Sequence, residues 1–532
     1  MWVAACAVVA VGLFTAYLFQ SRTQAVNADG ASNALQAWDM LHGNVLLHGW
    51  RVSDVSFYTT ELPEYALVEA VRGLGSDVVH VCAAVTYTLL VFLAGWLAAG
   101  SAKGRQGLHG AREGITRALI AAGIMLAPSL GDASYTLLLS PDHTGTAVPL
   151  LVTWILVDRG AGTERWRRCV PFAVCLLLAV AAVGDPLAAV IGAVPLAAVC
   201  AMRVAQGLAQ RREPFRDRAY ELSLAVAALL SVGLAYGMVH LIAAAGGWTS
   251  TAVRTGVASG SMAGRNGSLG FRGVLELFGA DFFDLQPGRE VVFATVHLAG
   301  VALVAWGLWL AVRRFFGGEL LAQVLLVAIV VNLAAYLAGT QVQDIHSTRE
   351  IAAVLPFGAV LAGRLLAGRL LAAPLLARRA PAAVKVAISV TGLALLASYA
   401  AMLGFGASQP ATPADNADLT AWLAGHGLTR GLGGYWQANG VTVDSGNSVT
   451  VRSVVVNENR LMPEAYWEAK QEWFEPSSNY ANFLVTASAP QGESDSALES
   501  HLAALAGRPA HVYEFGRYTI AVWDRNLLTA LG

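Results

Sequence analysis

The stretch that decides the fold is residues 319–338, ELLAQVLLVAIVVNLAAYLA, which is apolar along nearly its whole length. About 20 mostly apolar residues are enough for a helix to cross a bilayer. The rest of the 532-residue chain has the same character, since 56% of its residues are hydrophobic, only 13% are charged, and the mean hydropathy is +0.54. Ordinary soluble domains carry about 25% charged residues. The composition therefore excludes a conventional soluble enzyme.

The same length rule predicts about eleven membrane spans. The fourth is short, and the fifth and sixth are separated only by residues 184–186. The first has no basic segment before it, so it is predicted to be a retained helix and not a cleaved signal peptide. The expected spans lie near 1–20, 78–100, 117–139, 147–158, 169–184, 187–203, 219–245, 291–312, 319–338, 351–368 and 382–404.

The distribution of basic residues predicts the orientation, because cytoplasmic loops are enriched in Lys and Arg. With a cytoplasmic N-terminus, the inner loops hold 20 of the 35 basic residues, the outer loops hold 8, and the chain after residue 405 holds 7. We therefore expect a multi-pass protein of the cell membrane with a cytoplasmic N-terminus and an extracytoplasmic C-terminal tail. The net charge of −1 gives no indication of a nucleic-acid partner.

The predicted outer face carries four loops and a small domain. The loops are 21–77, 140–146, 246–290 and 339–350, and the Gly-rich part of the third, 246–273, is typical of a mobile segment. In the first loop Ser32 can cap a helix, and a second helical pattern precedes the second span, so two short surface helices are expected.

Composition changes after Pro410, where alternating segments at 449–456 and 517–523 predict strands and 414–426 and 495–506 predict helices. We therefore divide the chain into a membrane domain, 1–405, and an extracytoplasmic α/β domain, 406–532. The second contains an aromatic cluster that could stack on sugar rings or form a core. Its members are Tyr435, Trp436, Tyr466, Trp467, Trp473, Phe474 and Tyr480.

No soluble-enzyme motif is present: the sequence has no Walker segment, dinucleotide fingerprint in strand-turn-helix context, nucleophile elbow or HExxH. The five cysteines have neither disulfide nor metal-ligand spacing. The sequence therefore predicts no metal site and no certain cofactor, and leaves a divalent cation open. The candidate functional residues are acids, histidines and arginines at the outer ends of spans.

Asp29 follows the first span by about nine residues. A partly desolvated carboxylate at this position can act as a general base. The alternative is that Asp29 only starts a turn with Gly30.

Asp142 and His143 share the short second outer loop, where an acid beside an imidazole could bind a cation or a phosphate-linked sugar. The alternative is an Asp-stabilised turn. Asp185, followed by Pro186, has the pattern of a helix N-cap, so no functional role is predicted for it.

The fourth loop, QVQDIHSTRE at 341–350, brings Asp344, His346 and Arg349 to the start of the tenth span. Arg349 is the only arginine of this loop, and its planar fork suits a phosphate. The alternative is an ion pair of Arg349 with Glu350 or Asp344 that anchors the helix end.

This arrangement resembles the GT-C class of polytopic glycosyltransferases, which includes protein mannosyltransferases, aminoarabinose transferases and oligosaccharyltransferases. The similarity lies in one span, a long outer loop with an early acid at Asp29, two surface helices, further acidic outer loops and a late outer loop with a basic residue. The segment FYTTELPEY, 57–65, is similar to a Pro-containing aromatic stretch late in that loop, and a soluble outer domain also occurs in the class.

The resemblance implies an enzyme that transfers a sugar from a polyprenyl-phosphate-linked donor to an acceptor outside the cytoplasm. It implies that Asp29 is the base of an inverting displacement, that Arg349 neutralises the lipid phosphate, and that Asp142 and His143 shape the site. Many members carry two adjacent acids in the first loop, whereas Asp29 stands alone between Ala28 and Gly30. This departure weakens the assignment of the base and of a metal.

Two other classes remain open. A transporter or flippase for a lipid-linked or small substrate needs polar residues at mid-membrane, whereas the predicted spans are nearly free of charge. A non-catalytic scaffold would act through its tail and leave the first loop unconstrained. The position of the largest polar cavity separates the three classes.

Overall fold

The computed structural model describes residues 2–100, 107–139, 142–160, 164–210, 215–253, 255–283, 285–376, 382–457, 460–487 and 496–531. These residues form two compact units. The first comprises Met1–Thr23, Ala83–Met238 and Arg254–Pro410, and the second comprises Gln24–Cys82, Val239–Val253 and Ala411–Gly532. The positions 1, 140, 141, 254, 284 and 495 of the predicted spans, loops, strands and helices lie outside the described residues.

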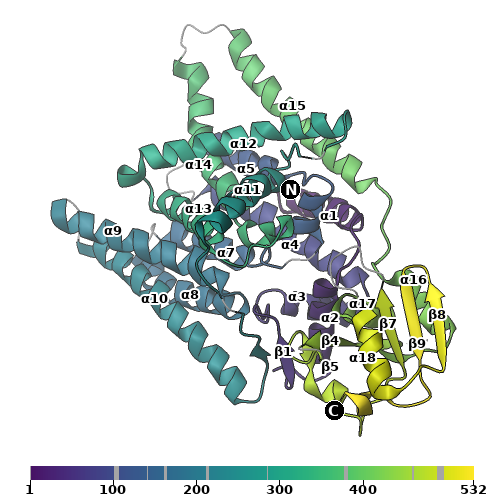
Figure 1. Ribbon diagram of the computed structural model, residues 1–532. Helices are drawn as coiled ribbons and strands as arrows, with labels where there is room; N and C mark the ends of the chain where they lie inside the picture. Colours follow the sequence, from purple (N-terminus) through teal and green to yellow (C-terminus); the bar gives the residue numbers. More distant parts are fainter. Residues whose placement is uncertain are drawn as a thin grey trace. The chain divides into compact units, whose positions relative to one another are not determined.

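The first unit is helical (Figure 1). The helices that lie wholly or mainly in it are α1 (Trp2–Ser21), α4 (Asp77–Ala99), α5 (Gly107–Met125), α6 (Asp132–Leu138), α7 (Ala147–Gly160), α8 (Glu164–Gly184), η2 (Ala189–Ala193), α9 (Val194–Gln210), α10 (Phe215–Ala244), α11 (Gly260–Leu277), α12 (Arg289–Arg313), η3 (Phe315–Gly317), α13 (Leu320–Ala338), η4 (Ile345–Ile351), α14 (Val354–Leu376) and α15 (Ala382–Ala407).

Nine helices of the described chain are long and apolar enough to cross a membrane. The two remaining predicted spans differ from expectation. The segment 117–139 is split, because α5 ends at Met125 and α6 begins at Asp132, and α7 has only 14 residues. The segment 246–273, expected to be mobile, contains most of helix α11, whose N-cap Ser259 accepts from the Met262 amide. The protein is a polytopic helical membrane protein.

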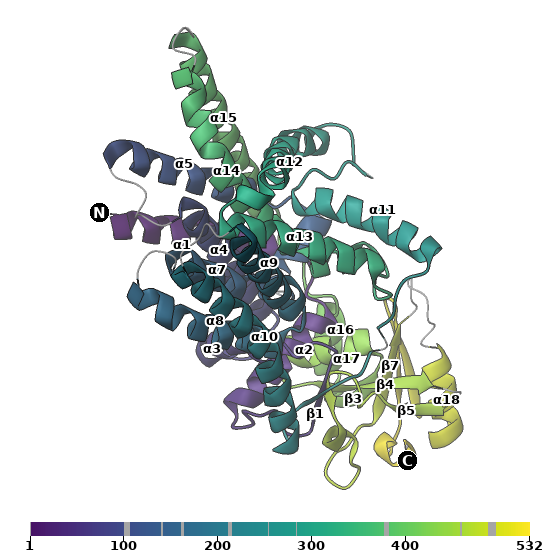
Figure 2. The same cartoon turned by 90° about the vertical axis from the view of Figure 1, so that its left-hand side faces the viewer.

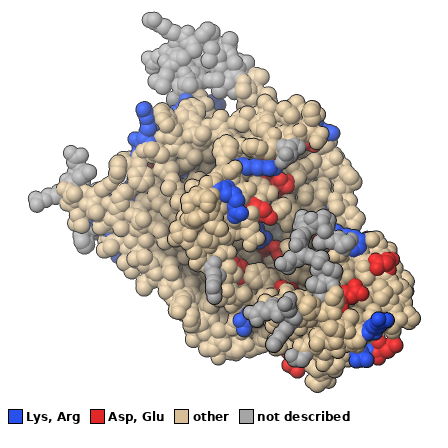
Figure 3. All heavy atoms as spheres, in the orientation of Figure 1, with Lys and Arg blue, Asp and Glu red and all other residues tan. Residues whose placement is uncertain are grey.

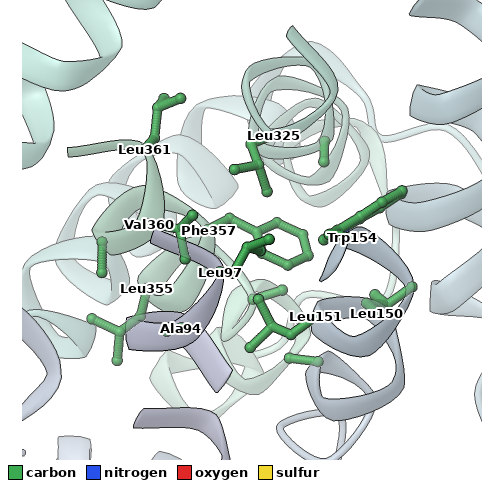
Figure 4. Close-up of a cluster of buried hydrophobic side chains, with 14 of the residues drawn as sticks. Ala94, Leu97, Leu150, Leu151, Trp154, Leu325, Leu355, Phe357, Val360 and Leu361 are labelled. Atoms are coloured by element: carbon green, nitrogen blue, oxygen red, sulfur yellow. The ribbon is translucent and has the colours of Figure 1, made fainter. Parts of the chain in front are cut away.

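The core of this unit forms where α4, α7, α13 and α14 meet. Trp154 of α7 and Phe357 of α14 are completely or almost completely buried, and Leu97 and Leu325 are in the same cluster (Figure 4). Helix α14 also packs against α5 and α12, and α13 packs against α9 (Figures 1 and 2). Between apolar helices in lipid, association depends on close packing and small residues.

Gly363 shows how tight this packing is. A Cβ atom at that position would lie 2.5 Å from the backbone oxygen of Arg117, so α14 and α5 can approach this closely only with glycine. Acidic and basic atoms are sparse on the face shown in Figure 3, as the low charge content requires.

The second unit contains a six-stranded mixed sheet in the order β5-β4-β3-β7-β9-β8. Strand β3 runs parallel to β4 and β7, and the other neighbours are antiparallel. The strands are β3 (Arg430–Gly433), β4 (Thr450–Asn457), β5 (Arg460–Pro463), β7 (Phe483–Ala487), β8 (His511–Phe515) and β9 (Tyr518–Val522). The predicted strands at 449–456 and 517–523 are thus confirmed as β4 and β9.

Helices cover both faces of this sheet (Figure 1). Leu484 packs in one hydrophobic cluster with α18, and its neighbour Phe483 packs in the other with α16 and α17, as the alternation of a strand requires. The helices of the unit are α2 (Ala28–Leu41), α3 (Leu62–Arg72), α16 (Ala417–Gly425), α17 (Tyr435–Asp444), η5 (Gln471–Phe474), α18 (Ser496–Ala506) and η6 (Leu527–Ala530). The expected C-terminal α/β fold is confirmed.

A small second sheet joins three distant segments of this unit. Strand β1 (Trp50–Val52) of the first loop pairs in parallel with β2 (Thr249–Ser250) and antiparallel with β6 (Ala469–Lys470). Helix α2 also packs against α3 and α17. Because the first loop and the C-terminal residues fold together, they must lie on the same side of a membrane.

Candidate functional site

Asp29 lies in the first turn of helix α2. Asn27 caps this helix by accepting a hydrogen bond from the Gly30 amide. The helix therefore begins earlier than the predicted cap at Ser32, and Asp29 and Gly30 lie in the helix and not in a turn. Ser32 instead donates to the Ala28 carbonyl inside the helix. Negative charge is favourable at a helix N-terminus. The Asp29 carboxyl group therefore lies at the positive end of the α2 dipole.

Two C-terminal side chains meet the Asp29 carboxylate. The Tyr435 hydroxyl lies 2.8 Å from Asp29 Oδ1 and 2.5 Å from Glu468 Oε2. Burial raises the pKa of Tyr435, and the charges of Glu468 and Asp29 raise it further, so the phenol keeps its proton. Glu468 is only 4% exposed, whereas Asp29 is half-buried. Tyr435, predicted as a stacking or core aromatic, is thus a hydrogen-bonding partner of two acids.

Further polar contacts fix α2 against the C-terminal residues. Asn439 donates to Ser32 at 2.8 Å, and Lys470 Nζ lies 2.8 Å from Asp39 Oδ2. The Trp50 indole donates to the same Asp39 oxygen at 2.8 Å. The position of Asp29 is therefore set by contacts from residues more than 400 positions away as well as by its own helix.

His143 and Asp185 form a buried pair in the first unit. His143 has a left-handed backbone, with φ of +58°, and its Nδ1 lies 3.0 Å from Asp185 Oδ2. Asp185 also accepts from the Thr146 hydroxyl at 2.6 Å and from the Leu187 amide at 2.9 Å. The Leu187 contact is the predicted capping role of Asp185, and the contact with His143 was not predicted.

The two members of this pair stabilise each other's charge. Burial alone would lower the pKa of His143 and raise that of Asp185, but the contact between them outweighs burial at both. The pKa of His143 is raised and the pKa of Asp185 is lowered. The charge of Arg349 acts in the opposite direction on the His143 pKa, so the second and fourth predicted outer loops meet here.

The fourth predicted outer loop forms the short helix η4. Asp344 caps it by accepting from the His346 amide at 3.0 Å, and Ser347 completes a capping box. The exposed His346 ring contacts the Tyr135 ring at a tilt of 47°, with 4.4 Å between centroids. Arg349 is half-buried, and Asn332 of α13 donates to the Glu350 carbonyl at 3.0 Å, which fixes the end of η4. Asp142 is buried beside His143, and its carbonyl accepts from the Thr144 amide at 2.7 Å.

Helix α11 adds an acid that sequence reasoning missed. Glu276 is buried and accepts from Thr136 of α6 at 2.9 Å, and burial raises its pKa to about 8. One turn earlier, Arg272 pairs with Asp281 at 3.1 Å and with Asp132 at 3.7 Å. The i,i+4 spacing of Arg272 and Glu276 was a usable signal, but Arg272 fell in the segment interpreted as mobile, 246–273, and Glu276 lies just beyond it.

The structure thus brings Asp142, His143 and Arg349 together in the first unit, with Asp344 and His346 on the same short helix as Arg349. Asp29 belongs to the second unit, with Tyr435 and Glu468. In the described part of the chain, no group of three or more His, Cys, Asp or Glu side chains is arranged to hold a metal ion.

No protein family model and no curated protein sequence matches this chain. Solved structures do resemble it. ArnT from Cupriavidus metallidurans, in a crystal structure with bound undecaprenyl phosphate, superposes with a TM-score of 0.55 over 98% of this chain and 97% of its own, at 15% identity. An oligosaccharyltransferase from Archaeoglobus fulgidus, tethered to an acceptor peptide, gives a TM-score of 0.47 over 90% of this chain and 69% of its own, at 12% identity. The chain is therefore similar in fold to ArnT, a glycosyltransferase of the GT-C class, as the sequence resemblance implied.

Proposed function

We propose that this protein is a membrane glycosyltransferase. It moves a sugar from a polyprenyl-phosphate-linked donor to an acceptor at the extracytoplasmic face, with inversion at the sugar carbon. The observation that carries the proposal is the likeness in fold, over nearly the whole chain, to an ArnT structure that binds undecaprenyl phosphate. The candidate functional residues lie in the predicted outer loops, which also supports the proposal.

In the proposed reaction Asp29 is the general base. The acceptor hydroxyl oxygen forms a bond to the sugar carbon, the bond between that carbon and the phosphate oxygen breaks, and the acceptor proton passes to the Asp29 carboxylate. The polyprenyl phosphate leaves with the electron pair of the broken bond. The position of Asp29 in the first turn of α2, where its carboxyl group contacts Tyr435 and is half-buried, supports this role.

Arg349 binds the donor phosphate in this proposal. A guanidinium can donate two parallel hydrogen bonds to a phosphate and so stabilise the charge that develops on the leaving group. Asp142 and His143, with Asp344 and His346 near the same helix, shape the donor site. The His143–Asp185 pair supports this assignment, since the contact with Asp185 fixes the His143 ring in the same region as Arg349.

We further propose that the N-terminus is cytoplasmic and that the second unit is extracytoplasmic. The excess of Lys and Arg in the predicted inner loops supports this orientation. Single cysteines placed at the exposed Arg112 and Glu475 in a cysteine-free variant test it. An impermeant maleimide added to intact cells should label the second and spare the first. Labelling of Arg112→Cys alone would reverse the orientation.

The base is tested by measuring transfer with the full chain in proteoliposomes. Undecaprenyl-phosphate-linked sugars serve as donors, an envelope fraction supplies acceptors, and release of undecaprenyl phosphate is followed. Asp29→Asn should lower turnover by about 10²- to 10⁴-fold, the usual contribution of a general base. Asp54→Asn, at an exposed aspartate of the same loop, is the matched control. Activity of Asp29→Asn equal to that of the control would exclude the base role.

The phosphate role is tested on the same donors. Arg349→Ala should raise the apparent KM for the donor, and Arg349→Lys, which keeps the charge without the fork, should be intermediate. An unchanged KM in Arg349→Ala would favour a purely structural role. If the wild-type protein moves the lipid-linked sugar across the bilayer without releasing undecaprenyl phosphate, it is a transporter and the proposal fails.

A further inference from the structure

The second unit contains an arginine that has no charged partner among the described residues. Arg452 of β4 forms no ion pair and no hydrogen bond with any of them. Its Nη1 atom is fully buried, whereas its Nε and Nη2 atoms are not, so these two can reach a ligand. Burial lowers the pKa of the guanidinium to about 10, so the group stays positive at neutral pH.

The place of Arg452 in the sheet does not account for a charged side chain. Arg452 pairs with Leu432 of β3, and residues paired across two strands point to the same face of the sheet. Leu432 and Val454, two positions further along β4, both belong to the hydrophobic cluster that includes α18. An apolar side chain would fit this row, whereas a cation here loses water that no described polar group replaces.

Arg452 stands at one end of a row of two cations and two indoles. Its Cζ atom lies 3.8 Å from the centre of the Trp473 ring, and the Trp473 and Trp50 rings meet edge to face at 5.0 Å. At the other end Lys470 Nζ lies 5.9 Å from the centre of the Trp50 ring and pairs with two carboxylates. The two ends therefore differ. Trp473 attracts the charge of Arg452 but accepts no hydrogen bond in its ring plane, so the N–H groups of the fork stay available.

We infer that Arg452 binds an oxyanion, the phosphate or carboxylate group of a ligand, with Trp473 as the surface that holds the guanidinium in place. Buried charges in proteins are paired, and the described chain supplies no anion for this one. A guanidinium can donate two parallel hydrogen bonds to two oxygens of one phosphate or carboxylate. The proposed transfer reaction does not require this site, so the inference goes beyond the proposed function.

Thermal unfolding of the full chain in detergent tests whether Arg452 lacks a partner within the protein. In Tris chloride, without oxyanions, Arg452→Met should unfold at a higher temperature than wild type, because an apolar side chain fits the row and no charge is left buried. Arg430→Met, at an exposed arginine of the neighbouring strand β3, is the matched control and should unfold as wild type does. A lower unfolding temperature in Arg452→Met than in the control would overturn the inference.

Fluorine NMR of the full chain labelled with fluorotryptophan measures binding directly. The signal that is missing from Trp473→Phe belongs to Trp473. Inorganic phosphate should shift this signal in wild type and in Arg430→Met. Half-saturation should need roughly 10- to 100-fold more phosphate in Arg452→Met, the usual effect of losing a hydrogen bond to a charged group. Arg452→Lys, which keeps the charge without the fork, should be intermediate.

Sodium chloride at the same ionic strength is the control for screening and should leave the Trp473 signal unchanged. The same response to phosphate in wild type and Arg452→Met, or the same response to chloride and phosphate, would overturn the inference. Acetate in place of phosphate shows whether the site prefers a carboxylate.

Nanodiscs separate a lipid headgroup from a soluble ligand. A Trp473 signal that is already shifted in phosphatidylglycerol nanodiscs without added phosphate, in wild type and not in Arg452→Met, identifies the headgroup as the source. A shift only after phosphate or acetate is added identifies a soluble ligand, and no shift in any preparation would overturn the inference. These measurements need no turnover, so a chain that binds oxyanions but transfers no sugar would contradict the proposed function alone.

Discussion

Two places in the molecule bring a pair of acids to one central side chain. In the first unit Arg364 pairs with Asp158 at 2.7 Å and with Glu319, and it donates to the Leu97 carbonyl at 2.8 Å. In the second unit the acids Asp29 and Glu468 meet Tyr435. A guanidinium supplies positive charge and several donors, whereas a phenol supplies one donor and no charge.

The difference separates a cluster built on an arginine from one built on an uncharged tyrosine. Around Arg364 each acid meets a permanent cation, so no proton has to move. The C-terminal end of α7 and the N-terminal end of α13 are held to the middle of α14. Around Tyr435 the two acids meet a neutral hydrogen-bond donor. Three substitutions test this contrast, from the largest expected effect to the smallest.

Arg364→Ala should cause the largest loss of stability. The substitution leaves two acids without their cation. Removing one partner of a buried ion pair in this way lowers the free energy of unfolding by about 3–5 kcal/mol. Thermal unfolding in detergent measures the effect, and the exposed Arg112→Ala is the control. If Arg364→Ala unfolds at the same temperature as Arg112→Ala, the cluster has no structural role and the contrast fails.

Asp185→Asn should destabilise less, because its partner His143 can release its proton whereas an arginine cannot. The pKa of His143 is raised in the folded protein. Its contribution to the free energy of unfolding is therefore complete below the pKa of the unfolded chain and is lost as pH rises through the pKa of the folded protein. The pKa of Asp185 is lowered in the folded protein, so its contribution to the free energy of unfolding is lost as pH falls through that lowered pKa.

The stability difference between wild type and Asp185→Asn is therefore expected to be greatest near pH 5–6, between the two ordinary pKa values. Unfolding temperatures at pH 5.5 and pH 8.5 measure it. A difference of equal size at both pH values would mean that His143 is uncharged in the folded protein.

Near pH 5 Glu69→Gln should have the smallest effect of the three, and at higher pH its effect should have the opposite sign. Glu69 of α3 is buried, its carboxylate oxygens have no hydrogen-bond partner among the described residues, and burial raises its pKa to about 9. The folded state keeps this proton where the unfolded chain has lost it, so the wild-type protein loses stability as pH rises from about 4.5 towards 9.

Glu69→Gln removes this dependence. It should match wild type near pH 5 and unfold at a higher temperature at pH 8, as followed by thermal unfolding at both values. A variant less stable than wild type at pH 8 would mean that Glu69 is ionised and paired in the folded protein.

Much of the fold could be predicted because hydrophobicity is a local property. Length and apolarity locate most of the spans, and alternation locates β4 and β9. The predictions that were wrong also depended on local sequence patterns. The helix α11 was missed because its glycines lower helix propensity, although its partners η4, α6 and α13 hold it in place. The start of α2 was placed too late because Ser32 and Asn27 are both good caps.

The candidate site was predicted in part. Asp29, His143 and Arg349 were identified from their positions at the ends of spans. Asp185 was interpreted as a cap alone, and Glu468 was not considered, because nothing in the residues around it distinguishes it from a surface acid. Glu468 is linked to the candidate site through Tyr435, which lies 33 positions from it in the sequence and contacts Asp29, 406 positions away.

The sequence by itself determined the solvent of this protein, the approximate spans and the distribution of basic charge, because each of these depends on residue type counted over about 20 neighbours. Only the tertiary structure decided which acids meet a cation and which meet a phenol. Those pairings join segments far apart in the chain, and their charge states depend on burial and on distances of about 3 Å, which no local pattern records.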